Sequence, residues 1–137
     1  MNTFDTVADQ DLAAMQKRAA ELNVQGVAVV AASSGSSVKS WSSRMLVVGQ
    51  MKDGPSSDFP TGINLVAIAY SKAAEMADTL QASGSGSRAA MKGEYGWEGG
   101  VTAQGKTGWL FAAFSGGSSA DDVKISNAAM TILTASL

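Results

Sequence analysis

The chain of 137 residues contains no cysteine and no histidine. Without cysteine it cannot form a disulfide bond, a thiolate metal site or a thiolate nucleophile. Without histidine, Ser–His catalysis and histidine-ligated zinc or haem are excluded within a single chain. Disulfide bonds are the main sequence sign of a secreted protein, so their absence leads us to expect a cytoplasmic protein.

The chain also lacks a strong net charge and a long apolar run. Its formal net charge is −2, whereas a protein that binds nucleic-acid phosphates normally has a basic face. No apolar run approaches the roughly 20 residues that span a bilayer. The first residues include Asp5 and Asp9 and lack the basic segment with which a signal peptide begins. We therefore expect no nucleic-acid partner and no membrane partner.

The composition is that of a folded protein. Hydrophobic residues make up 45% of the chain and charged residues 16%. A chain of this length buries a sizeable core without disulfide bonds or other crosslinks. We therefore expect one domain over residues 1–137, with no linker that divides it.

Three segments have the apolar spacing of helices. The spacing predicts helices over about residues 6–22 and 62–81, and a third that begins at the capping-box pattern Ser-Ala-Asp-Asp of residues 119–122. Thr61 and Asn64 are alternative N-caps of the central helix. This helix is rich in alanine, and a small-residue face allows the close approach of a sheet or of another subunit.

Short segments rich in valine and aromatic residues predict the strands, which are residues 24–32, 38–41, 45–51, 99–102 and 109–114. Residues 52–57 predict a loop. The strands within each group follow one another closely, which favours antiparallel pairing. We expect an α+β fold with a central antiparallel sheet of about five strands, flanked by helices.

A glycine-rich run over residues 83–100 carries most of the unusual chemistry. Its first part, SGSGS, precedes Arg88, and the two together predict either an anion site or a flexible connection after the helix. Its second part, GEYGWEGG, places Tyr95 and Trp97 between glycines. These aromatic side chains either line a ligand-binding site or cover the hydrophobic core.

Several polar residues have two interpretations each. Lys72 lies among apolar positions of the central helix, where it acts as a base or, more often, pairs with a carboxylate. Glu75 and Asp78 are three residues apart and are expected on a solvated face rather than at a cation. The segment over residues 115–119 either binds an anion at a helix N-terminus or caps that helix, and we favour the cap.

Four segments of the chain match a known family in order and spacing. They are AAELNVQGVAVVAA, AIAYSKAAEMADT, WEGGV and FSGGSSADDVKISNAAMTIL. Together they resemble the GlcG/HbpS-like family, which includes the C-terminal domain of PduO-type proteins. The resemblance implies a profilin-like sandwich that forms homo-oligomers. Lys72, the Gly99-Gly100 pair, Ser115 and an acid at residue 121 or 122 fit positions of the family's pattern.

The resemblance also raises the question of haem, because some relatives bind haem and others are encoded with glycolate or diol metabolism. The chain departs from the family at Ala31-Ala32, where an aspartate is common. Iron ligation would need tyrosine, methionine, lysine or a hydroxyl group, because histidine and cysteine are absent. We therefore expect no cofactor, or weak haem binding that depends on Tyr95 and Trp97, and no metal site.

Two functions remain open from the sequence. The leading hypothesis is a non-catalytic small-molecule-binding or sensor/accessory module, and the alternative is a lyase or isomerase that acts on a small hydroxy or keto acid through Lys72, Tyr70 or Glu94. A homo-oligomer is expected through the small-residue face of Ala69, Ala73 and Ala77. The predicted ligand-binding residues are Asn64, Tyr70, Lys72, Arg88, Glu94, Tyr95, Trp97, Gly99, Gly100 and Ser115.

Overall fold

A four-stranded antiparallel sheet organises the chain, whose computed structural model describes residues 3–137. The strand order is β2-β1-β6-β5. The strands are β1 (Gly26–Ser33), β2 (Trp41–Val48), β5 (Gly100–Gln104) and β6 (Trp109–Ser115). The sequence predicted about five strands in this sheet, and the structure corrects the number to four.

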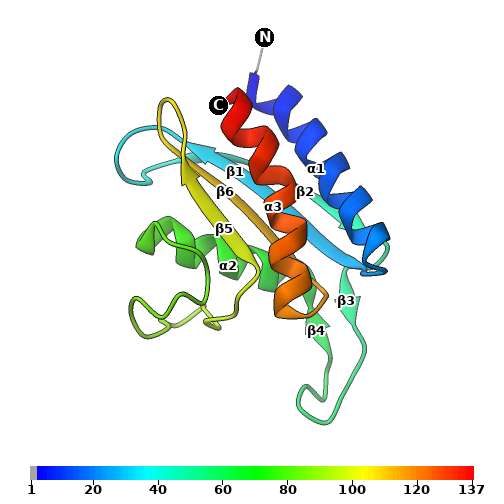
Figure 1. Ribbon diagram of the computed structural model, residues 1–137. Coiled ribbons are helices and arrows are strands. Elements are labelled where there is room, and N and C mark those ends of the chain that lie inside the picture. The colour runs from blue at the N-terminus through cyan, green and yellow to red at the C-terminus, as the bar shows by residue number, and fades with distance from the viewer. Residues whose placement is uncertain (1–2) are drawn as a thin grey trace.

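Three helices cover the two faces of the sheet. Figure 1 shows α1 (Thr3–Glu21) and α3 (Ser119–Ser136) side by side on one face, with α2 (Leu65–Thr79) on the other. The expected α+β fold with helices flanking an antiparallel sheet is confirmed. No helix within residues 3–137 is long and apolar enough to cross a bilayer.

Strand β1 lies at the centre of the core, because helices cover both of its faces. Its side chains alternate, so that Val27 and Val29 pack under α2 while Ala28 and Val30 pack under α1 and α3. A strand buried on both faces has an almost continuous apolar sequence rather than an alternating one. This explains why the run GVAVVAA contains no polar residue.

Strand β2 is one continuous strand, whereas the sequence predicted two short ones over residues 38–41 and 45–51. Its register with β1 runs without a break from Val48 opposite Gly26 to Trp41 opposite Ser33. The gap between the two predicted strands consists of the polar residues 42–44. A strand at the edge of a sheet accepts polar side chains because it is only partly buried.

A small separate hairpin holds the start of α2. Strands β3 (Lys52–Asp53) and β4 (Ile63–Asn64) pair in the region for which a loop was predicted. Asn64 is the N-cap of α2, and its side-chain oxygen accepts a hydrogen bond from the Ala67 amide at 3.1 Å. The helix therefore begins at Leu65, three residues after the predicted start.

The alanine-rich face of α2 packs inside the chain. Ala69 and Ala73 are buried, and Ala69 contacts the β1 valines Val27 and Val29. Small side chains allow this helix to lie close to the sheet. The expected homo-oligomer stays a prediction, and these two residues are not exposed for a partner subunit.

One buried acid in the core has no partner. The side chain of Asp11 on α1 is fully buried, and neither of its carboxylate oxygens has a hydrogen-bond partner within the described residues. Burial raises the pKa of Asp11 to about 7. The ionised form is therefore poorly solvated in the folded protein.

We predict that Asp11 makes folding less favourable as the pH rises. Its pKa is raised above the value in the unfolded chain, so its contribution to stability is full below about pH 4 and is lost as the pH rises through about 7. The Asp11→Asn variant does not titrate at this position. Between pH 4 and pH 8 the wild type should lose up to about 4 kcal/mol of unfolding free energy relative to this variant, measured by urea unfolding.

The control is Asp58→Asn, which removes an exposed acid. It should follow the pH dependence of the wild type. An Asp11→Asn variant with the same pH dependence as the wild type would contradict the prediction.

Candidate functional site

A small polar pocket lies where β6 ends and α3 begins. It has a volume of about 130 Å³ and is closed by residues from the β3–β4 hairpin, from α2 and from the loop before β5. Three of the predicted ligand-binding residues line it, namely Lys72, Trp97 and Ser115. Its other lining residues are Asp53, Ile63, Leu65, Glu98, Gly116, Gly117, Ser119 and Asp122.

The Lys72 ammonium group lies at the inner wall of this pocket, and only 4% of the residue is exposed. Its Nζ donates hydrogen bonds to the Phe114 carbonyl oxygen at 2.7 Å and to Asp122 Oδ2 at 3.1 Å. An ammonium group has three N–H donors. Two of them are used by these protein acceptors, and the third is free for a water molecule or a ligand in the pocket.

Asp122 is the counterion of this lysine. Its Oδ1 also accepts a hydrogen bond from the Gly117 amide at 2.9 Å. Burial lowers the pKa of Lys72 and raises the pKa of Asp122, while the attraction between the two charges opposes both shifts. The interpretation that Lys72 pairs with a carboxylate is confirmed.

The predicted capping box of α3 is wrong in its register. The N-cap is Ser118, whose side-chain oxygen accepts a hydrogen bond from the Asp121 amide at 3.2 Å. The sequence predicted Ser119 with Asp122. The carboxylate of Asp122 turns instead toward Lys72, because a buried ammonium group requires a nearby anion.

The Gly99-Gly100 pair makes room for the ion pair. Gly99 has a φ of +134°, and a Cβ atom there would collide with Lys72 Nζ and would come within 2.9 Å of the Phe114 carbonyl oxygen. Its own carbonyl oxygen accepts a hydrogen bond from Ser126 Oγ at 2.6 Å. The absent side chain therefore lets the lysine reach Asp122, which gives this glycine a packing role.

The N-terminus of α3 adds backbone donors to the pocket. The first amides of a helix have no acceptor inside the helix, and Ser119, the first helical residue, lines the pocket. Asp121 and Asp122 lie in the first turn and offset part of the positive helix dipole. The amides of Gly117, Asp121 and Asp122 are already bonded within the protein, and the charged residues of the pocket lining are one lysine and three acids.

An aromatic wall separates this pocket from a second cavity of about 110 Å³. Trp97 and Ile63 line both cavities, and the predicted residues Asn64 and Tyr95 line the second one. The rings of Tyr95 and Trp97 lie 5.0 Å apart, and Phe59 meets Trp97 edge to face at 6.1 Å. These aromatic side chains pack on one another beside the pocket.

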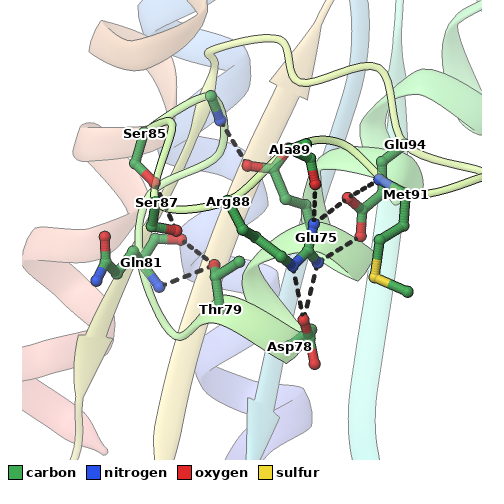
Figure 2. Close-up of polar contacts among 11 residues, drawn as sticks. Glu75, Asp78, Thr79, Gln81, Ser85, Ser87, Arg88, Ala89, Met91 and Glu94 are labelled. Atoms are coloured by element: carbon green, nitrogen blue, oxygen red, sulfur yellow. Dashed lines mark hydrogen bonds and ion pairs between the residues drawn. The ribbon is translucent and has the colours of Figure 1, made fainter.

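Arg88 is engaged by the protein itself. Figure 2 shows its guanidinium group between Glu94, which it contacts at 2.7 and 2.8 Å, and Asp78, which it contacts at 2.8 and 3.0 Å. The bond with Arg88 lowers the pKa of Glu94 to about 2. Neither Arg88 nor Glu94 lines the two cavities. Their geometry fastens the glycine-rich loop to α2.

Glu75 also fastens this loop, which corrects the prediction of a solvated face. The side chain is buried, and its Oε2 accepts a hydrogen bond from the Gly84 amide at 2.8 Å. Ser83 Oγ accepts a hydrogen bond from the Gly100 amide at 2.8 Å. The SGSGS segment is therefore bound to α2 and to the start of β5 at several points.

Sequence reasoning located part of the pocket and missed the rest. Tyr70 packs instead against Val27, Val29 and Leu65 and lines neither cavity. The lining residues outside the predicted ligand-binding set are Asp53, Ile63, Leu65, Glu98, Gly116, Gly117, Ser119 and Asp122, of which Ser119 and Asp122 were considered as part of the helix start. A usable signal for Asp122 was the lysine at a buried helical position, since a buried lysine is rarely without a carboxylate partner.

The cavities beside Tyr95 and Trp97 are small, and the described acids do not cluster. No group of three or more acidic side chains within residues 3–137 is placed to hold a metal ion. The cavities beside Tyr95 and Trp97 have volumes of about 110 and 130 Å³, well below the roughly 300 to 1,000 Å³ of sites for larger cofactors and ligands. These residues therefore do not fit a tetrapyrrole, and weak haem binding or none stays a prediction.

A scan against protein-family models and a search of curated proteins find no match to this chain. The resemblance to the GlcG/HbpS-like family therefore stays a prediction. The function has to be argued from the pocket and its ion pair.

We predict that Gly99→Ala disrupts the ion pair and destabilises the fold. The new methyl group would overlap Lys72 Nζ, and alanine disfavours a φ of +134°. The unfolding free energy should fall by about 2 kcal/mol or more in urea unfolding. Gly54→Ala is the control, because its Cβ would meet no atom within 4 Å, and its stability should change little.

We predict that Arg88→Lys loosens the loop of residues 80–99. A lysine cannot make the two-pronged contact with Glu94 while it also holds Asp78. Amide hydrogen exchange over residues 83–98 should become several-fold faster, while exchange in β1 stays unchanged. Arg18→Lys, in an exposed pair with Glu21, should leave this loop as protected as in the wild type. Equal protection in the Arg88 variant would be evidence against the fastening role.

Proposed function

We propose that this protein is a small-molecule-binding module with a sensor or accessory role, and that its ligand is a small oxygenated acid bound beside Lys72. The observation that carries the proposal is the third N–H donor of a buried ammonium group at the wall of a polar pocket. A ligand oxygen in this pocket can accept a hydrogen bond from this donor in place of water.

The size of the pocket limits the ligand. At about 130 Å³ it is far smaller than a typical pocket for a drug-sized molecule. A ligand oxygen can accept a hydrogen bond from Lys72 Nζ, and Ser119 at the start of α3 lies in the same pocket lining. An acid of two or three carbons is the class that combines such an oxygen with this volume.

The charges around the pocket limit the ligand to at most one negative charge and favour a hydroxyl group on it. Asp122 already balances the charge of Lys72, and Asp53 and Glu98 lie in the pocket lining. A second negative charge on the ligand would meet these carboxylates, whereas a hydroxyl group can donate a hydrogen bond to one of them. A small 2-hydroxy monocarboxylic acid meets both conditions.

The rival proposal is an enzyme, and one observation favours it. Burial lowers the pKa of Lys72, which brings its amine form closer to neutral pH. In this alternative, a lyase or isomerase would use Lys72 on a keto acid. Asp122 and the Phe114 carbonyl oxygen both hold protons on Lys72, which favours the binding module.

The ligand test uses sodium glycolate and NMR of the full chain. Glycolate should shift the amide signals of Gly117 and Ser119 with a saturable dependence on concentration. The Lys72→Met/Asp122→Asn variant should bind at least about 10-fold more weakly, since it lacks a charged hydrogen-bond donor. The matched control Lys39→Met/Asp58→Asn makes the same change of charge at two exposed residues outside the pocket and should bind like the wild type.

Two results would count against this proposal. One is the absence of any shift at Gly117 and Ser119 up to high glycolate concentration. The other is a covalent adduct at Lys72 after incubation with pyruvate and cyanoborohydride, detected by mass spectrometry, which would support the enzyme instead.

A further inference from the structure

Three cavities lie around the β3–β4 hairpin and share lining residues. Besides the pocket beside Lys72 and the second cavity, a third cavity of about 280 Å³ is lined by residues 51–53 and 61–64. Ile63 of β4 lines all three cavities, and Trp97 lines the first two. Among the described lining residues, these are the two that the pocket and the second cavity have in common. Their side chains therefore form the wall between the two spaces.

The two members of this wall differ in what else they contact. Ile63 is half-buried and packs against the buried cluster that contains Val27 and Leu65, so the core depends on it. Trp97 is 37% exposed and belongs to none of the three core clusters. Its ring contacts the rings of Tyr95 and Phe59 instead. The packing of the core therefore does not account for a tryptophan between the two cavities.

The backbone that carries Trp97 is held on both sides. Before it in the fold, Gly84 packs so closely that a Cβ atom there would lie 2.8 Å from the Glu98 nitrogen and 3.0 Å from the Trp97 carbonyl carbon. The Gly84 amide is itself bonded to Glu75 of α2 at 2.8 Å. After it in the chain, the Gly99 carbonyl oxygen accepts a hydrogen bond from α3 at 2.6 Å. The indole ring therefore stands on a fixed backbone.

We propose that Trp97 sets the upper size limit of the ligand, because its indole ring closes the pocket beside Lys72 toward the second cavity. The inference rests on the proposed function, since it concerns the same site. An acid that reaches Lys72 Nζ has about 130 Å³ available, and a ring attached to that acid would need the space of the indole ring. Without the indole ring, the pocket joins the second cavity of about 110 Å³, and the joined space takes an aryl-substituted 2-hydroxy acid.

The first experiment compares sodium glycolate with sodium phenyllactate, a 2-hydroxy acid that carries a phenyl ring, by NMR titration of the full chain. The wild type should bind phenyllactate at least about 10-fold more weakly than glycolate, because the indole ring occupies the space of the phenyl ring. In Trp97→Ala the ratio of the two dissociation constants should shift at least about 10-fold toward phenyllactate, since the phenyl ring is then buried. Trp97→Leu, which keeps an apolar side chain, should shift the ratio in the same direction by a smaller factor.

The matched control is Phe59→Ala. Phe59 lines the second cavity but not the pocket, so this variant enlarges the second cavity and leaves Trp97 in place. Its ratio of dissociation constants should be that of the wild type. A shift as large as in Trp97→Ala would show that the size of the second cavity, and not the wall, limits the ligand, and would overturn the proposal.

Indole tests the wall without an acid. In Trp97→Ala, indole should fill the vacated space and shift the amide signals of Ser119 in the pocket and of Ala67 in the second cavity. In the wild type and in Phe59→Ala it should not shift both signals. A shift of the Ala67 signal alone in Trp97→Ala would show that Trp97 does not close the pocket.

These measurements separate the failure of this inference from the failure of the proposed function. If glycolate binds and the ratio of dissociation constants is unchanged in both Trp97 variants, the size limit is overturned and the proposed function stands. If no variant binds either acid while indole in Trp97→Ala shifts the signals of both cavities, the proposed function fails and Trp97 is supported as the wall.

Discussion

The buried ion pair between Lys72 and Asp122 is the contact on which the rest of the site depends. It joins α2 to the first turn of α3, and the bond from Lys72 to the Phe114 carbonyl oxygen adds the end of β6. These three elements come from both faces of the sheet. Removal of one partner would leave an unpaired buried charge, which typically costs 3–5 kcal/mol. The position of the pocket is therefore fixed by this pair.

The sequence predicted the local elements well, because their signals are local. The three helices follow from apolar spacing, and Asn64 was one of two N-caps considered. Strand β2 was split because its polar residues resemble a turn until its place at the sheet edge is known. Glu75 was predicted in solvent because its partner, the Gly84 amide, lies in a loop that folds back onto α2. Each error concerns a contact between distant segments.

The site was only partly predictable for the same reason. Lys72 stood out as a charged residue among apolar positions, yet its partner Asp122 lies 50 residues away and looked like a helix cap. Arg88 and Glu94 looked like ligand contacts because they are charged and lie beside glycines. In the structure they bind each other and Asp78, so their charges hold a loop in place. Composition identifies charged side chains, while only the fold shows which of them are already paired.

The stability of the fold alone does not explain the Lys72–Asp122 pair. Well-packed apolar residues of similar volume often replace a buried ion pair with no loss of stability, and sometimes with a gain. The chain accommodates the pair with glycine at residue 99, whose left-handed backbone leaves space for Lys72 Nζ. It also leaves one N–H donor of the ammonium group without a protein acceptor, at the wall of a pocket. The proposed ligand would supply an acceptor for this donor, which is a role that the stability of the fold does not account for.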